Sequence, residues 1–264
     1  MPLPIVDFRH FDALKCNVIF HKWYYLHQVK IQWKHLFPNI VKYSRFIQLV
    51  SHAFFPMFCF IKKHQGVWGD LQFIDSTVLT SCHVKRASSH RTFRSSARWG
   101  KTTTGWFFGF KLHLIINQYA EIVAFRLTKG NVDDRKPVPG MTRPMKRGKV
   151  FGDRGYISEK LRNELLGRGV LLITKVKRNM KNKLMTIYDK LMLRKRALIE
   201  SVHNILKSSC QIEHHRHRSR WNFLSNLLSG LATYCLKPDK PRLHFSAEEI
   251  EKLRSLPSFS MALR

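Results

Sequence analysis

The stretch Leu71-Gln-Phe-Ile-Asp75-Ser-Thr-Val-Leu79 carries apolar side chains on both faces of an extended chain, with one carboxylate near its centre. This pattern predicts a strand that is buried on both faces, as in a sheet covered by helices. A buried carboxylate costs free energy unless a cation or several hydrogen bonds compensate it. Asp75 is therefore a candidate metal ligand. The alternative is a structural Asp satisfied by Ser76, Thr77 or a nearby Lys.

The pattern on both sides of this stretch predicts further strands and helices. Apolar runs bounded by turn residues predict strands over residues 107–116, 121–127, 149–153 and 170–174. Helical spacing predicts helices over 158–166, 191–207 and 223–236, and the capping box Ser246-Ala-Glu-Glu249 begins a last short one. This order predicts an α/β fold in which a mixed sheet lies between helices. It is compatible with a ribonuclease-H-like core, although the pattern alone does not single out that topology.

Residues 17–63 show helical spacing with one break at Pro38-Asn39. Two helices around a short break suit a small DNA-binding unit, and a helical prop against the catalytic domain is equally compatible. We therefore expect a helical N-terminal region over residues 1–64, a catalytic domain over 65–236 and a C-terminal tail with a short helix over 237–264.

The charge of the chain indicates its partner. Lys and Arg number 47 against 17 Asp and Glu, which gives a net charge of +30 spread along nearly the whole sequence. A polyanion makes such a charge tolerable, and nucleic acid fits a broad cationic surface. The longest apolar stretch, residues 46–61, is interrupted by Gln48, His52 and Pro56, so we expect no membrane span. The five scattered Cys and the absence of any CxxC pair fit a reducing cytoplasm.

Residues 76–120 contain no acidic side chain. We expect a long mobile basic loop here, with residues 88–101 disordered until DNA binds. Trp99 and Trp106 flank the end of this loop, where they would either stack on an unpaired base or pack in the core. The loop residues expected to contact DNA are Lys85, Arg86, Arg91, Arg94, Arg98 and Lys101.

Acidic residues are few in so basic a chain, so each can be weighed as a metal ligand. Phosphodiester cleavage is served by two Mg²⁺ ions about 3.5–4 Å apart, held by clustered carboxylates. Asp153 ends the predicted strand 149–153, where α/β sheets commonly carry their chemistry, and a helix N-cap is the alternative role. Asp133 and Asp134 follow a Gly-Asn turn and are expected to be turn and cap residues.

Glu200 and Glu213 compete for the third position. Glu200 shares one polar helical stripe with Arg196, His203 and Lys207. On its own it would be a surface ion pair with Arg196, but two buried strand acids favour the metal role. On a continuous helix Glu213 would lie about 20 Å away, so the two acids could not share one metal pair.

Glu213 begins the cationic run Glu213-His-His-Arg-His-Arg218. The spacing of Cys210 and the nearby His residues fits no common zinc pattern. We expect Arg216 and Arg218 to contact phosphates instead.

Four motifs occur in order: Phe73-Ile-Asp75-Ser-Thr, Thr128-Lys-Gly-Asn-Val-Asp-Asp134, Gly152-Asp153-Arg-Gly-Tyr156, and Arg196-x3-Glu200-x6-Lys207. Together they resemble bacterial insertion-sequence transposases of the Asp-Asp-Glu type, with the insertion sequence 982 family as the nearest match. The resemblance covers roughly residues 17–231. It implies a ribonuclease-H-like core, Mg²⁺ dependence with Mn²⁺ as an alternative ion, and action on the terminal repeats of the element. It also implies that Asp75, Asp153 and Glu200 are the metal ligands.

The chain departs from the family pattern in two places. Related transposases often carry Tyr three residues before the Arg of the last motif, where this chain has Leu193. Arg196, His203 and Lys207 are then the expected DNA contacts of that motif. The first sixteen residues differ from the usual start of the family, so a truncated or frameshifted N-terminus is an alternative.

The expected function is Mg²⁺-dependent cleavage and strand transfer on double-stranded DNA, both terminal inverted repeats and target DNA. The alternatives are a metal-dependent nuclease of the same fold and a non-catalytic or decayed nucleic-acid-binding protein. A homodimer assembled on DNA is left open, and the expected location is the bacterial cytoplasm at the nucleoid.

Overall fold

Strand β1 (Leu71–Cys82) forms the centre of a six-stranded sheet in the computed structural model, which describes residues 25–36, 38–175, 185–213 and 217–254. The sheet order is β2-β3-β1-β5-β6, and β4 pairs with β3. The other strands are β2 (Arg98–Thr102), β3 (Gly105–Asn117), β4 (Ile122–Lys129), β5 (Gly148–Gly152) and β6 (Val170–Thr174). β1, β2, β3 and β4 are joined by antiparallel pairs, whereas β5 runs parallel to β1 and β6 parallel to β5.

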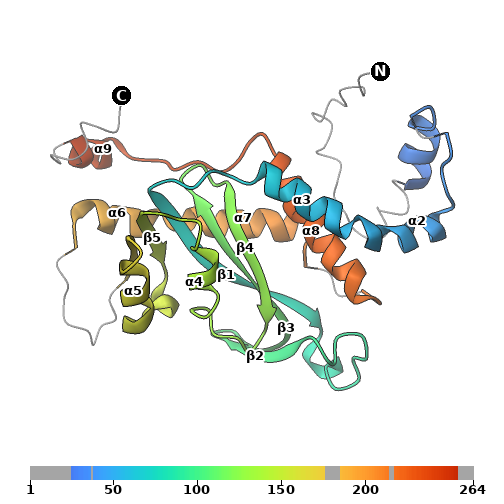
Figure 1. Ribbon diagram of the computed structural model, residues 1–264, viewed down its shortest axis with the longest axis horizontal. Helices are drawn as coiled ribbons and strands as arrows, with labels where there is room; N and C mark the ends of the chain where they lie inside the picture. The colour runs from blue at the N-terminus through green and yellow to red at the C-terminus, as the bar shows by residue number, and fades with distance from the viewer. Residues whose placement is uncertain (1–24, 37, 176–184, 214–216, 255–264) are drawn as a thin grey trace. The chain divides into compact units, whose positions relative to one another are not determined.

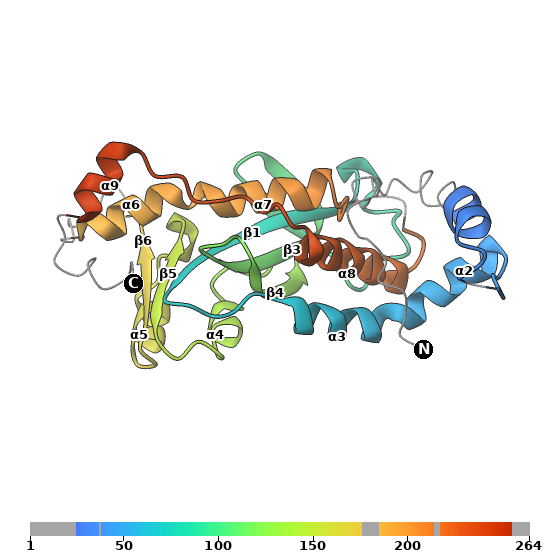
Figure 2. The same cartoon turned by 90° about the horizontal axis from the view of Figure 1, so that it is seen from above.

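Helices cover both faces of this mixed sheet, as Figure 2 shows. α4 (Val138–Met141) and α5 (Glu159–Leu166) lie on one face, while α6 (Ile187–Lys195) and the first turns of α7 (Ala197–Ser208) lie on the other. α5 begins where the Ser158 hydroxyl accepts a hydrogen bond from the Leu161 amide at 3.3 Å. The predicted α/β architecture, a mixed sheet between helices, is confirmed.

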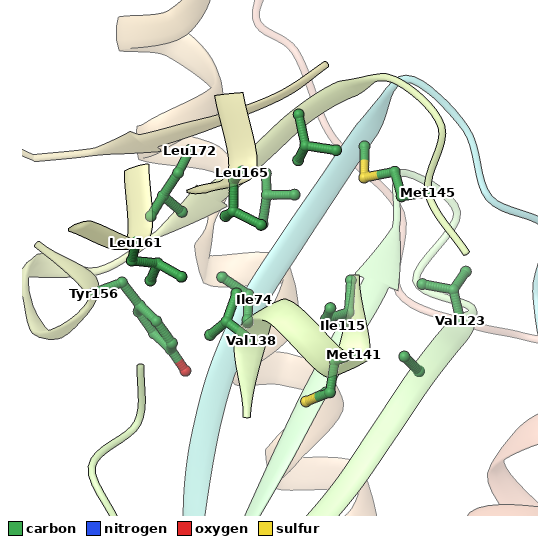
Figure 3. Close-up of a cluster of buried hydrophobic side chains, with 13 residues drawn as sticks. Ile74, Ile115, Val123, Val138, Met141, Met145, Tyr156, Leu161, Leu165 and Leu172 are labelled. Carbon is green, nitrogen blue, oxygen red and sulfur yellow. The ribbon is translucent and has the colours of Figure 1, made fainter. Parts of the chain in front are cut away.

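One apolar core lies between the sheet and α4 and α5. Figure 3 shows its side chains converging from β1, β3 and both helices, among them Ile74, Ile115, Val138 and Leu161. Because side chains alternate along a strand, Ile74 points into this core while Phe73 and Asp75 lie on the opposite face. Phe73 packs there against Phe151 of β5, with ring centroids 6.0 Å apart. The core therefore fixes β1 so that Asp75 is presented on the face that carries α6 and α7.

The chain divides into two compact units. The sheet unit comprises residues 65–203 and the described residues from Lys237 onward. The helical unit comprises the described residues up to His64 together with Asn204–Leu236. The domain division expected from the sequence, at residues 64 and 236, stays a prediction.

The helical unit contains η2 (Tyr25–Gln32), α2 (Tyr43–Val50), η3 (Ser51–Ala53), α3 (Phe54–His64) and α8 (Arg220–Leu236). Figure 1 shows α3 beside α8. Phe54 packs edge-on against Trp221 with centroids 5.6 Å apart, and the Ser225 hydroxyl donates to the Val50 carbonyl at 3.3 Å. The predicted helical character of this region is confirmed from residue 25 onward, and the predicted part before it lies outside the described residues. Its binding to DNA stays a prediction.

Within the helical unit, the run Tyr43–His64 is long and apolar enough to cross a membrane, judged by length and composition only. It is the one such run among the described residues. The residues Gln48, His52 and Pro56 do not interrupt this run, because α2, η3 and α3 follow one another without a break. The expectation of no membrane span stays a prediction. A single run of this kind is weak evidence for a membrane partner, since core helices of soluble proteins share its composition.

After the helical unit the chain returns to the sheet unit, where α9 (Ala247–Arg254) is held against α6. The Lys195 ammonium lies 2.6 Å from the Glu249 carboxylate and over the Phe245 ring. The predicted capping box is confirmed, because Ser246 and Glu249 exchange backbone-to-side-chain hydrogen bonds of 3.0 and 3.2 Å.

The prediction of a mobile basic loop within residues 76–120 was wrong at both ends of the segment. β1 continues to Cys82, and residues 98–102 form the strand β2. Between them Phe93 is buried and meets Phe110 edge-on, with centroids 5.7 Å apart, while Ala87 and Ala97 are also buried. These three apolar side chains attach the segment to the sheet, so its cationic composition alone was a poor guide to its structure.

Candidate active site

Asp75 and Asp153 lie on neighbouring parallel strands. β1 and β5 pair Gln72 with Val150 and Phe73 with Phe151, and Asp75 and Asp153 each lie two residues beyond this last pair. Asp153 directly follows β5, and its Oδ1 accepts the Gly155 amide at 2.8 Å. Asp153 therefore caps the short helix η5 (Arg154–Tyr156), the alternative that its sequence position also allowed, and it does so next to Asp75.

Arg196 joins the strand acid to the helix acid. Its Nη1 lies 3.2 Å from Asp75 Oδ2, and its Nη2 lies 2.7 Å from Glu200 Oε1. Arg196 stands at the junction where α6 ends and α7 begins, one turn before Glu200. The surface ion pair that the i, i+4 spacing predicts is present, and the same guanidinium reaches the sheet. α7 thus brings Glu200 to the face of β1 that carries Asp75.

The electrostatics of Asp75 reflect this crowding. Burial raises the pKa of the Asp75 carboxyl to about 6, opposed by the Arg196 guanidinium and by the Ser76 amide, which donates to Oδ1 at 2.9 Å. The carboxylates of Asp153 and Glu200 raise this pKa further, so all three acids interact. Repulsion of this kind is relieved by a bound cation.

The donor set fits a hard divalent cation, because carboxylate oxygens are the ligands that Mg²⁺ prefers. In the part of the chain that the structure describes, no three His, Cys, Asp or Glu side chains are close enough to enclose a metal ion. Arg196 lies between Asp75 and Glu200 and supplies the positive charge there. Closing the three acids around a metal would require this guanidinium to move.

His203 is the second cationic candidate at the site. Its Nδ1 lies 3.9 Å from Asp75 Oδ2, and its side chain is buried. The structure thus brings Asp75, Asp153, Glu200, Arg196 and His203 together in the sheet unit.

Lys207 belongs instead to the helical unit, where its Nζ lies 2.9 Å from Glu213 Oε2. α7 ends at Ser208, so Glu213 follows outside the helix. The separation expected for a continuous helix therefore does not apply to Glu200 and Glu213.

The predicted DNA contacts of the former loop are exposed side chains. Lys85 and Arg86 lie on the short helix η4 (Val84–Arg86), Arg91 and Arg94 in the following turns, and Arg98 and Lys101 on β2. Arg218 is exposed ahead of α8, and Arg216 lies outside the described residues. All six Lys and Arg side chains between residues 85 and 101 are exposed to solvent, so a polyanion can contact them.

A buried polar group on the opposite face of the sheet from Asp75 was missed from the sequence. Lys111 Nζ lies 3.0 Å from Asp134 Oδ1, and His113 Nε2 lies 2.8 Å from the Thr128 hydroxyl. Burial lowers the pKa of His113 to about 4, although Asp134 opposes the shift. His113 pairs with Ser76, the residue after Asp75, so this group supports the strand that carries the acid. The sequence contains a signal for this group, because Lys111 and His113 stand two residues apart on one face of an otherwise apolar strand.

The two motif acids before α4 play different parts. The Asp133 carboxylate accepts the Arg135 amide at 2.9 Å and pairs with the Arg135 guanidinium, so the turn role expected for it is confirmed. Asp134 makes an ion pair with Lys111 instead.

Comparison with known proteins places this geometry in context. The family model described as "Transposase DDE domain" matches residues 65–220, more than half of the chain. Among solved structures, the piggyBac transposase synaptic complex with hairpin DNA matches with a TM-score of 0.32 and 14% identity, over 45% of this chain and 25% of that chain. The simian T-cell lymphotropic virus intasome in complex with PP2A regulatory subunit B56 gamma matches with a TM-score of 0.34 and 11% identity, over 69% of this chain and 55% of that chain. No curated protein matches.

The chain thus spans less than two thirds of the length of either structural neighbour. The family match covers nearly the whole sheet unit, including Asp75, Asp153 and Glu200. The protein therefore belongs to the DDE transposase domain family, whose members are generally enzymes that use a divalent metal ion.

Proposed function

We propose that the protein is a DNA transposase that cleaves and rejoins DNA at the ends of its own insertion sequence, with two Mg²⁺ ions held by Asp75, Asp153 and Glu200. The observation that carries the proposal is the convergence of the three acids. Arg196 bridges Asp75 and Glu200, and the carboxylate of Asp153 is near enough to raise the pKa of Asp75. Carboxylates that lie close enough to repel one another and shift a pKa are typical of a functional site.

Two Mg²⁺ ions, when bound, stabilise the attacking and leaving oxygens of a phosphodiester and activate a water or a 3′-hydroxyl as the nucleophile. Mn²⁺ is an alternative ion for the same carboxylates. Asp75 and Asp153 would hold the metal pair from the sheet, and Glu200 from α7. Arg196 and His203 flank Asp75 and would contact the phosphate once the carboxylates bind metal.

Double-stranded DNA is the proposed substrate, both the terminal inverted repeats and the target. The net charge of +30 supports this choice, as do the exposed cations along residues 85–101. Arg218 and Lys207 would add contacts from the helical unit, and assembly of a homodimer on DNA fits a reaction that handles two ends. Membership of the insertion sequence 982 family and action at the bacterial nucleoid are parts of the same proposal.

The test is a reaction of the purified chain with DNA that carries the sequences flanking its coding region. Mg²⁺-dependent nicks at the element ends, followed by joining to a target plasmid, would support the proposal. Asp75→Asn and Asp153→Asn serve as inactive controls. Nicks without joined products would favour the alternative of a metal-dependent nuclease. No cleavage in Mg²⁺ or Mn²⁺ would favour a non-catalytic DNA-binding protein.

A further inference from the structure

β2 and the beginning of β3 form a two-stranded arm, residues 98–107, at one end of the sheet (Figure 1). Within it Lys101 pairs with Trp106 and Thr102 with Gly105. β3 first pairs with β1 at Phe108, which faces Cys82, so the tip of the arm continues past the register of β1. The Thr102 hydroxyl closes the turn by donating to the Gly105 carbonyl at 3.1 Å.

One face of the arm exposes two tryptophans around a lysine. The side chain of Trp99 is 42% exposed and that of Trp106 is 60% exposed. The Lys101 ammonium lies 5.6 Å from the Trp106 ring centroid, and Trp99 packs against Phe108 at its inner end. Trp99, Lys101, Trp106 and Phe108 share this face because directly paired residues of an antiparallel ladder point the same way. The arm therefore presents flat apolar rings and a cation together.

The exposed face of the arm is continuous with the sheet face that carries Asp75. Even-numbered residues of β3 from Trp106 onward point to one face, and Leu114 on that face lies directly opposite Asp75. Eight residues separate Trp106 from Leu114, a distance of about 27 Å along an extended strand. Phe108, Phe110 and Leu112 of this face are buried between the two sites. The arm and the acids therefore lie on the same side of the sheet, separated by a covered stretch.

The charge around the arm favours a polyanion as the occupant. Arg94, Arg98 and Lys101 are exposed, and the sequence has no acid between Asp75 and Glu121. Exposed Trp rings beside a cation are the composition of surfaces on which unpaired bases stack while a cation meets the phosphate. The bases of an intact duplex offer no free faces to such rings.

We propose that the arm binds unpaired nucleotides of a DNA strand, with bases stacked on Trp99 and Trp106 and a phosphate on Lys101. The inference rests on the proposed function in one respect, because the bound strand would be the one processed at the acids. Binding itself requires no metal and no cleavage.

The experiment measures binding of the full chain, in chelator, to a duplex with and without an oligothymidine overhang, by fluorescence anisotropy. Trp106→Ala and the double variant Trp99→Phe/Trp106→Ala should weaken binding to the overhang DNA about tenfold, as expected for loss of one stacked base. Binding to the blunt duplex should be unchanged. Trp106→Phe, which keeps an aromatic ring, should restore most of the overhang affinity. The matched control is Tyr119→Ala, which removes a 65% exposed aromatic ring from the turn between β3 and β4 and should affect neither DNA.

Equal losses on blunt and overhang DNA, or no loss on either, would overturn the proposal. A change of oligomeric state in sedimentation with unaltered DNA binding would also overturn it, because the arm would then be a protein interface. The outcomes separate this inference from the proposed function. Selective loss of overhang binding in the Trp variants would support the proposed role of the arm whatever the cleavage result. Full cleavage by Asp75→Asn would contradict the proposed active site and leave the inference about the arm intact.

Discussion

Arg196 and Asp75 meet across the sheet and helix layers, with Nη1 of the guanidinium 3.2 Å from Oδ2 of the carboxylate. The same guanidinium reaches Glu200 at 2.7 Å. One cation thus compensates two acids from different elements. This makes Arg196 the residue whose removal should most change the electrostatics of the site.

Arg196→Ala should raise the pKa of Asp75 by about one pH unit above its value in the unaltered chain, because the nearest opposing positive charge is lost. The measurement is a carboxyl-carbon NMR titration in the presence of a chelator. Arg194→Ala is the matched control, since Arg194 is exposed two residues earlier and should leave the titration unchanged. An unaltered Asp75 titration in Arg196→Ala would mean that the bridge does not persist in solution.

Asp75 should also give stability a pH dependence. Its pKa is about 6 in the folded chain against an ordinary value of 3.8, so the folded state keeps a proton that the unfolded state releases. The free energy of unfolding should therefore fall as the pH rises from about 4 to about 6, by at most about 3 kcal/mol. Asp75→Asn should abolish this loss.

Urea unfolding of both chains in chelator between pH 4 and 7 measures the effect. The difference between the two curves isolates Asp75, because His113, with its pKa lowered to about 4, contributes an opposite slope to both. Parallel curves for the two chains would show that Asp75 ionises with an ordinary pKa.

Much of the fold could be predicted from the sequence because its elements have strong local patterns. The strand predicted over residues 170–174 coincides with β6, and the buried run around Asp75 coincides with most of β1. β2 was missed for a physical reason. It is a polar strand paired with β3, and its Gly100 admits the Gly130 carbonyl, so its existence depends on residues distant in sequence.

The site was predictable only in part. The burial of Asp75 follows from its strand, and the position of Asp153 follows from the end of another strand. The approach of Arg196 to Asp75 depends on how α7 crosses the sheet, which periodicity does not specify. Asp189 is not singled out by the sequence pattern, yet it is buried with its Oδ1 2.7 Å from Lys149 Nζ. The catalytic roles themselves stay predictions.

Gly109→Ala should destabilise the sheet unit by about 1–3 kcal/mol. A methyl group at this position would overlap the Leu79 carbonyl oxygen on β1, and because the clashing atoms are backbone, no side-chain rotation relieves the overlap. Gly167→Ala is the matched control, because the nearest atoms to its new methyl group would lie at 3.5 and 3.7 Å. Thermal unfolding of both variants tests this, and equal stability of the two would show that the pairing of β1 with β3 is looser than described.

Glu200→Gln should reduce DNA cleavage at least about a hundredfold while leaving DNA binding intact. The amide keeps the shape of the side chain but removes the charge that a hard cation requires. Binding should persist because it rests on many Lys and Arg residues rather than on one acid. Asp75→Asn and Asp153→Asn should behave in the same way, since the loss of any ligand disturbs the shared metal pair.

Glu213→Gln provides the sharpest comparison. Glu213 lies beyond the end of α7 and pairs with Lys207 at 2.9 Å, so its loss should leave substantial cleavage. The measurement is Mg²⁺-dependent nicking of end-containing DNA by the purified variants, with binding followed separately by gel shift. Full activity in Glu200→Gln together with loss in Glu213→Gln would assign the third ligand to Glu213. Loss of DNA binding in Glu200→Gln would instead indicate that Glu200 supports the fold of the DNA-binding surface rather than the metal.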